Sequence, residues 1–211
     1  MKSNPILTAF CSAAFLAAAA SLATADVVMI SETKIGEVKS RTTMSISGSM
    51  TRSDNGTETS VIIDTKTGAM TTLMHEQKMA IKMDMAQLAA MAGASKPAAG
   101  SEAVGKLTAT GKTQKIDGYA CELYLLENSG TQVSMWVTKD YPGYDKLKAE
   151  LAALRNLNPG GPKQPEVPGM TLRTEYTANG MTFVTSVVSL KEEKVDPKIF
   201  VVPANYVAPG Q

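Results

Sequence analysis

The sequence is poor in the residue types from which most metal and redox sites are built. Its 211 residues contain one histidine and two cysteines, and Cys11 lies in an N-terminal apolar run. The single cysteine beyond that run excludes an internal disulfide framework. One histidine, with no second His or Cys at ligand spacing, does not form a zinc site. We therefore expect no metal and no cofactor, and we expect packing to supply the stability.

The sequence also lacks an excess of charge of either sign. It has 21 Lys and Arg against 20 Asp and Glu, a formal net charge of +1. It has no run of basic residues either, so it does not resemble a nucleic-acid-binding protein.

The first 25 residues have the pattern of a secretory signal. Lys2 gives a positive start, an apolar Ala-rich run follows, and Ala23-Thr24-Ala25 is a small-x-small cleavage site. No basic stop-transfer cluster comes after it. We expect cleavage after Ala25, a single domain over 26–211, and no integral membrane segment in the mature chain.

The remainder alternates apolar and polar residues between short turn signals, which indicates antiparallel strands. The turn signals include Asp54-Asn55-Gly56, Asn128-Ser129-Gly130 and Asn179-Gly180. The strands are expected near 27–34, 38–53 with a bend at Gly48, 58–64, 69–74, 78–84, 106–114, 118–127, 131–138, 170–177 and 181–191. Asp196-Pro197 is expected to start one helical turn.

Two stretches have the spacing of amphipathic helices. The first begins after Asp84 and places Met85, Leu88 and Met91 on one face. The second covers about 143–156 and buries Leu147, Leu151 and Leu154. The composition of 93–105 predicts a mobile linker, and 158–169 is too rich in Pro and Gly for regular structure.

This order of elements predicts a mainly β (α+β) fold. Hairpin-length connections exclude a parallel βαβ sheet. We expect one strongly curved antiparallel sheet, an open and incomplete β-barrel whose concave side is covered by the two helices. A flat two-sheet sandwich is the alternative, but it leaves two apolar helix faces without a surface to cover.

Three local patterns carry a resemblance to a known family. They are Ile63-Asp64-x-x-x-Gly68, Ile116-x-Gly118-Tyr119-x-Cys121-x-x-Tyr124 and Val195-Asp196-x-x-x-Phe200-x-x-Pro203-x-x-Tyr206. Together they resemble a domain-of-unknown-function family of exported bacterial proteins, which looks related to the LolA/LolB-like periplasmic lipoprotein carriers. The resemblance implies an open half-barrel in the periplasm and transfers no activity and no functional residues.

Cys121 is interpreted as a buried apolar residue rather than a nucleophile. Alternation on its strand groups it with apolar residues, Tyr119, Leu123 and Leu125, and a thiol in such a setting has little thiolate. His75 is interpreted as a solvated turn residue. Counting alone leaves a Ser-His-Asp arrangement open, but no Gly-x-Ser-x-Gly signal is present. With no catalytic constellation visible, we expect a protein that is not an enzyme.

The methionines are the compositional oddity, since six of the 13 fall between Met70 and Met91. They could fill an ordinary core, line an adaptable apolar cavity, or bind Cu(I) at Met83-x-Met85. The leading hypothesis is an apolar-ligand site for an acyl chain or a lipidated partner. Its expected lining is Met74, Met83, Met85, Leu88, Met91, Leu147, Leu151 and Leu154. A structural or interaction module with a filled core is the main alternative, and a copper protein is the third.

Overall fold

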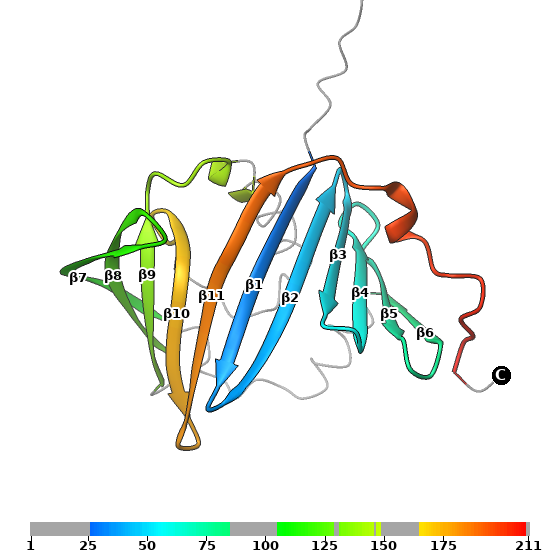
Figure 1. The fold of residues 1–211 in the computed structure, drawn as a ribbon, viewed down its shortest axis with the longest axis horizontal. Coiled ribbons are helices and arrows are strands. Elements are labelled where there is room, and N and C mark those ends of the chain that lie inside the picture. The colour runs from blue at the N-terminus through cyan, green and yellow to red at the C-terminus, as the bar shows by residue number, and fades with distance from the viewer. Residues whose placement is uncertain (1–25, 85–104, 129–130, 146, 149–164, 210–211) are drawn as a thin grey trace, which may run out of the picture.

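The described part of the chain forms one antiparallel sheet of eleven strands (Figure 1). The computed structural model describes residues 26–84, 105–128, 131–145, 147–148 and 165–209. The strands of the first half are β1 (Val27–Ile35), β2 (Val38–Ser47), β3 (Met50–Asn55), β4 (Thr59–Asp64), β5 (Ala69–Met74) and β6 (Met79–Asp84). Those of the second half are β7 (Lys106–Ile116), β8 (Tyr119–Asn128), β9 (Thr131–Thr138), β10 (Met170–Ala178) and β11 (Met181–Glu192).

The sheet consists of two runs of neighbouring strands joined along one seam. Its order from edge to edge is β6-β5-β4-β3-β2-β1-β11-β10-β9-β8-β7. Every neighbouring pair is also consecutive in sequence except β1 and β11. These two strands pair from Val27 opposite Glu192 to Ile35 opposite Phe183, and this pairing unites the two halves in one sheet.

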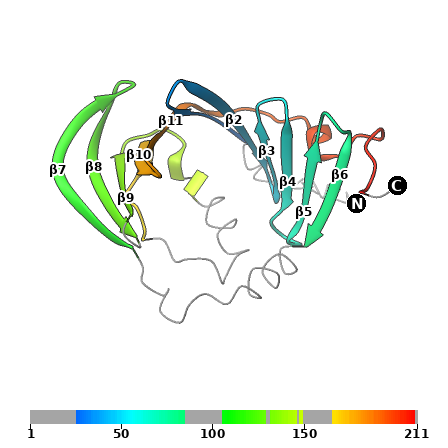
Figure 2. The same ribbon diagram turned by 90° about the horizontal axis from the view of Figure 1, so that it is seen from below.

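The sheet curves into an arch and does not close into a barrel (Figure 2). The register of β1 to β6 is regular, whereas three irregularities interrupt the second half. They lie at Val188 of β11, which is skipped between the pairs Ile30–Ser189 and Ser31–Val187, between Thr171 and Arg173 on β10, and between Ala109 and Thr113 on β7. Bulges bend a strand and increase its twist, so they account for the curvature of this half. The expected curved, open antiparallel sheet is therefore confirmed.

Most strand predictions lie within two residues of the observed bounds, but the strand expected over 38–53 is wrong. The chain reverses at Gly48 and Ser49, and Ser47 pairs with Met50 as the last pair of a hairpin. Gly48 has a φ of 55°, a left-handed conformation that glycine adopts at little cost. The bend expected at Gly48 is thus a full turn between β2 and β3.

The expectation of two helices covering the concave side is not supported by the described residues. The first expected helix lies at 85–91, outside them. In the second, Tyr144, Asp145, Leu147 and Lys148 are helical, and residues 149–156 again lie outside. The predicted single turn after Asp196 is confirmed as a 3₁₀ helix, η1 (Pro197–Phe200), capped by the Asp196 side chain. No described helix has the length and apolar character needed to cross a membrane.

Two separate apolar cores form on the sheet. The larger one contains Val27, Ile46, Cys121, Leu147, Met170 and Leu172. Its members come from both halves, so it packs across the β1–β11 seam. The smaller one contains Ile62, Leu73 and Ala80 and is packed against Phe200, Val202 and Tyr206 of the C-terminal segment.

Gly169, just before β10, provides a test of the packing against the end of β9. A Cβ atom there would lie 2.3 Å from the Thr138 backbone oxygen and 3.1 Å from Val137 Cγ1. Because backbone cannot move aside as a side chain can, Gly169→Ala should lower the free energy of unfolding by about 1–3 kcal/mol. Urea denaturation followed by the fluorescence of Trp136 measures this. Val38→Ala, at a position 69% exposed, is the control with little expected effect. Equal stability of the two variants would contradict the close approach.

Candidate ligand-binding pocket

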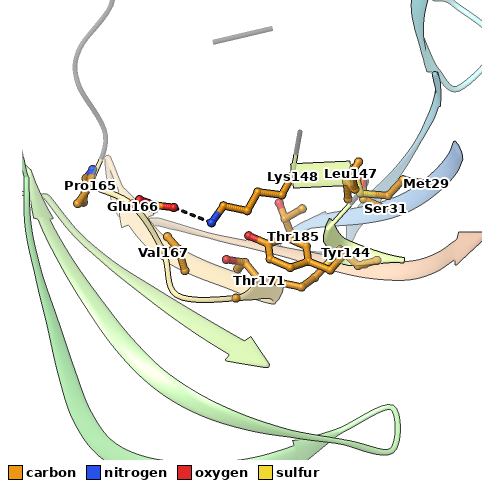
Figure 3. A pocket seen from close by; sticks show the side chains of 13 residues that line it. Met29, Ser31, Tyr144, Leu147, Lys148, Pro165, Glu166, Val167, Thr171 and Thr185 are labelled. Atoms are coloured by element: carbon orange, nitrogen blue, oxygen red, sulfur yellow. Dashed lines mark ion pairs between the residues drawn. The ribbon is translucent and has the colours of Figure 1, made fainter. Parts of the chain in front are cut away.

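A pocket of about 290 Å³ lies against the concave side of the seam (Figure 3). Strands β1, β10 and β11 provide its floor. The helical residues Tyr144, Leu147 and Lys148 provide one wall, and the irregular segment 165–169 before β10 provides another. The pocket therefore depends on the β1–β11 pairing and on the chain that leaves β9 and returns to β10.

The lining is divided by chemistry. Its apolar members are Met29, Leu147, Val167, Met170 and Val187, and its hydroxyl-bearing members are Ser31, Tyr144, Thr171 and Thr185. Alternation explains the grouping on the strands, since Met29 and Ser31 share one face of β1, and Thr185 and Val187 share one face of β11. Such a mixture suits a mostly apolar molecule with a small polar part.

One ion pair stands at the rim of the pocket. Lys148 Nζ lies 2.6 Å from Glu166 Oε1, and the two side chains are 45% and 72% exposed. The hydrogen bond and negative charge of Glu166 raise the pKa of Lys148. Both groups remain in contact with water, so the pair contributes little to stability and can separate at low cost.

The concave face continues from the pocket across the first half of the sheet. Directly opposite residues in an antiparallel pair share a face. From Val27, the register gives one row of Val27, Ile46, Thr51, Ile63, Met70 and Met83. From Ser31 it gives another row of Ser31, Thr42, Asn55, Thr59, Met74 and Met79. Four of the clustered methionines thus share a face with the pocket-lining Met29.

The residues predicted from the sequence to line one cavity lie in different parts of the structure. Leu147 is 1% exposed and lines the pocket. Met74 on β5 and Met83 on β6 lie on the same concave face but away from this pocket, and both are partly buried. Met85, Leu88, Met91, Leu151 and Leu154 lie outside the described residues. The pocket floor from β1, β10 and β11 was missed, because nothing local in the sequence shows that β1 and β11 pair.

Cys121 is buried, in agreement with its interpretation as a core residue. It is 1% exposed and packs in the larger core. Burial raises the pKa of its thiol, and the negative charge of Asp117 adds to the effect. The two faces of β8 differ less than expected, because Tyr124, which alternation places opposite Cys121, is only 8% exposed.

His75 lies in the turn between β5 and β6, as expected, but its side chain is partly buried and belongs to a polar cluster on the other, convex face. Its Nε2 lies 2.6 Å from Ser60 Oγ, and its Nδ1 lies 2.5 Å from the Tyr206 hydroxyl. Ser60 Oγ also lies 2.5 Å from Asp54 Oδ1, to which it donates. Arg52 donates to Asp54, to Ser60 and to the Ile199 carbonyl, at 2.7, 2.9 and 2.6 Å.

The directions of these bonds separate the cluster from a catalytic triad. Ser60 has one proton and gives it to Asp54, so the hydrogen bond with His75 requires Nε2 to be the donor. Nε2 therefore cannot accept the serine proton as a general base must. The other nitrogen faces Tyr206 rather than a carboxylate, and Ser60 is 1% exposed. We assign the cluster a structural role. The described residues also contain no group of three His, Cys, Asp or Glu placed to hold a metal.

Comparison with known proteins identifies a family match and distant structural similarity. The family profile described as "Domain of unknown function (DUF4412)" matches residues 22–206. No curated protein matches the chain.

Three solved structures illustrate the structural similarity. One of PNGF-II has 12% identity and a TM-score of 0.42 over 87% of this chain, which spans only 30% of PNGF-II. A DUF1329 family protein from Desulfovibrio piger has 8% identity and a TM-score of 0.36 over 84% of this chain and 90% of its own. LprF from Mycobacterium bovis has 8% identity and a TM-score of 0.35, and the match covers 86% of this chain and 90% of LprF. These scores are too low to carry an argument about function.

The buried thiol leads to a test of Cys121. As the pH rises past 9.0, the ordinary value for the thiol, the unfolded state loses this proton before the folded state does. The raised pKa therefore lowers folding stability at alkaline pH. From about pH 8 to about pH 10 the native protein should lose more stability than Cys121→Ala, in chemical denaturation. Iodoacetamide should modify Cys121 rapidly only in denaturant. Equal pH dependence of the two proteins, or rapid modification of the folded protein, would contradict the assignment.

The polar cluster leads to a test of Tyr206. Tyr206→Phe keeps the ring but removes the hydroxyl bonded to His75, which leaves a ring nitrogen without its partner. The free energy of unfolding should fall by about 1–2 kcal/mol, measured by urea denaturation. Tyr176→Phe is the matched control, because the Tyr176 ring stacks on Phe183 at 4.8 Å and its hydroxyl has no assigned hydrogen bond in the described part of the chain. Equal losses in both variants would show that the hydroxyl adds nothing.

Proposed function

This chain belongs to the DUF4412 family, described as a domain of unknown function, and we propose that it binds an apolar ligand on the concave face of its sheet. The ligand class is an acyl chain, either free or attached to a lipidated partner. The observation that carries the proposal is the pocket of about 290 Å³ lined by Met29, Leu147, Met170 and Val187.

The size of the pocket favours a single chain as the ligand. Ligand pockets are roughly 300–1,000 Å³ in volume, and this one lies at the lower limit. The apolar lining stabilises a bound acyl chain by removing its surface from water. The hydroxyl groups of Ser31, Thr171 and Thr185 give hydrogen bonds to an ester or carboxyl group at the polar end. The exposed pair of Lys148 and Glu166 stands where that end meets solvent.

The methionines of the concave face support the same ligand class. Met70, Met74, Met79 and Met83 extend the face away from the pocket. A thioether side chain is unbranched and flexible, so it adapts to ligands of different shape better than branched residues do. A longer acyl chain therefore finds apolar surface beyond the pocket.

The proposal includes the place of action. The apolar leader over 1–25 and its small-x-small site support export and cleavage after Ala25. We place the mature protein in the periplasm, where the acyl chains of lipids and lipoproteins must be shielded from water. A pocket with this lining supports ligand binding over a module with a filled core.

A binding measurement with a matched pair of variants tests the proposal. Delipidated protein should take up a fluorescent fatty acid with a stoichiometry of one. Val187→Phe places a ring in the pocket and should weaken binding at least about tenfold, because the ring occupies the volume that the acyl chain would fill. Val184→Phe is the control. Val184 lies on the opposite face of β11, across from Lys34 and Glu175.

Two results would count against the proposal. One is the absence of uptake together with the absence of co-purifying lipid in native mass spectrometry. The other is equal weakening by Val187→Phe and Val184→Phe, which would place the ligand elsewhere.

A further inference from the structure

Residues 195–209, here the C-terminal strap, run across the convex face and reach the free edge of β6 (Figure 1). At that edge Val207 pairs with Met79 in a parallel bridge. Val207 donates its amide hydrogen to the Lys78 carbonyl and accepts one from the Ala80 amide, both at 2.9 Å. The strap therefore occupies the position that a twelfth strand would take.

Side chains hold the strap in this position. Arg52 donates to the Ile199 carbonyl, and the Tyr206 hydroxyl bonds to His75. Phe200, Val202 and Tyr206 complete the smaller core, whose buried members all belong to the sheet. The convex face of β3 to β6 thus has a cover that comes from the same chain.

The strap covers only part of the edge. Its two backbone bonds reach Lys78 and Ala80, and a second cavity of about 370 Å³ begins beside them. Ala80, Ile81 and Lys82 line one side of this cavity, and strap residues line the other. Because alternate residues of an edge strand direct their backbone groups outward, Lys82 points its N–H and C=O to the same side as Ala80.

The sequence of β6 is complementary to itself. Two antiparallel copies of this strand related by a two-fold axis at Ile81 put the outward-facing Ala80 of each opposite the outward-facing Lys82 of the other. In the same register Met79 lies opposite Met83, which makes the concave side of the junction apolar. Lys78 lies opposite Asp84, which places opposite charges at both ends of the pair.

We propose that the strap is an intramolecular substitute for a partner strand and that its release lets β6 pair with β6 of a second copy of this chain. An exposed edge strand is a template for strand addition, and a covered edge is protected from it. The other edge strand, β7, is protected differently, by its register irregularity and by lysines at 106, 112 and 115. Of the two edges, as far as the described residues extend, the β6 edge is therefore the one that depends on a removable cover.

The test uses two truncations of the full chain. A chain that ends at Asn205 loses Tyr206 and Val207, whereas a chain that ends at Pro209 keeps both and serves as the control. Circular dichroism checks folding, and sedimentation velocity from micromolar to millimolar concentration measures association. The Asn205 chain should form dimers, and the Pro209 chain should remain monomeric.

A charge exchange checks the register. In the Asn205 chain, Lys78→Glu should weaken the dimer about three- to tenfold, because like charges then face each other at both ends. Adding Asp84→Lys to that variant should restore it. An Asn205 chain that folds and stays monomeric overturns the proposal. A dimer whose affinity does not change with the charge exchange also overturns it.

A second variant decides the question if the Asn205 chain does not fold. Val207→Pro keeps the full length but removes the amide hydrogen that bonds to Lys78, and Val207→Ala retains it. Dimers of the proline variant alone support the proposal. A folded proline variant that stays monomeric, or dimers of both variants, overturns it.

Discussion

The pairing of β1 with β11 is the interaction on which the rest of this structure depends. It joins the first and last of the described strands over nine residue pairs, and every other neighbouring pair of described strands is consecutive in the sequence. Without it, each half is a meander with an apolar face and no common core. With it, Val27 and Ile46 from one half pack in the same core as Met170 and Leu172 from the other. The pocket floor lies on this seam for the same reason.

The two faces of the sheet are covered by different means. On the convex side of β3 to β6, the strap supplies its own apolar residues and hydrogen bonds, so that surface is closed by the chain itself. On the concave side, the row that starts at Val27 consists mainly of aliphatic residues and methionine, whereas the row that starts at Ser31 combines polar residues with Met74 and Met79. The three sequence patterns serve this packing. Asp64 accepts bonds from Lys66 and Thr67 in a turn, Cys121 fills the larger core, and Tyr206 anchors the strap.

The sequence predicts local structure well because hairpins are specified locally. Asn179-Gly180 and Asp117-Gly118 adopt positive φ values, which their residue types favour, and the flanking strands appear where alternation puts them. The split at Gly48 was missed because one glycine permits either a bend or a reversal. His75 was misjudged because its partners Ser60 and Tyr206 lie 15 and 131 residues away. The terminal sequence pattern that contains Tyr206 is the signal that could have suggested a hydrogen-bond partner for His75.

The contrast between the polar cluster and the pocket decides where function is best sought. Around Ser60, the side chains of Arg52, Asp54, His75 and Tyr206 are joined by hydrogen bonds, and the serine proton points to Asp54 rather than to His75. Such a network fixes the relative positions of the side chains that form it. The concave pocket is the opposite case. Its hydroxyl groups border apolar side chains around a space of about 290 Å³, and the ion pair of Lys148 and Glu166 at its rim is exposed to solvent. We therefore place the proposed ligand site on the concave face rather than at the polar cluster.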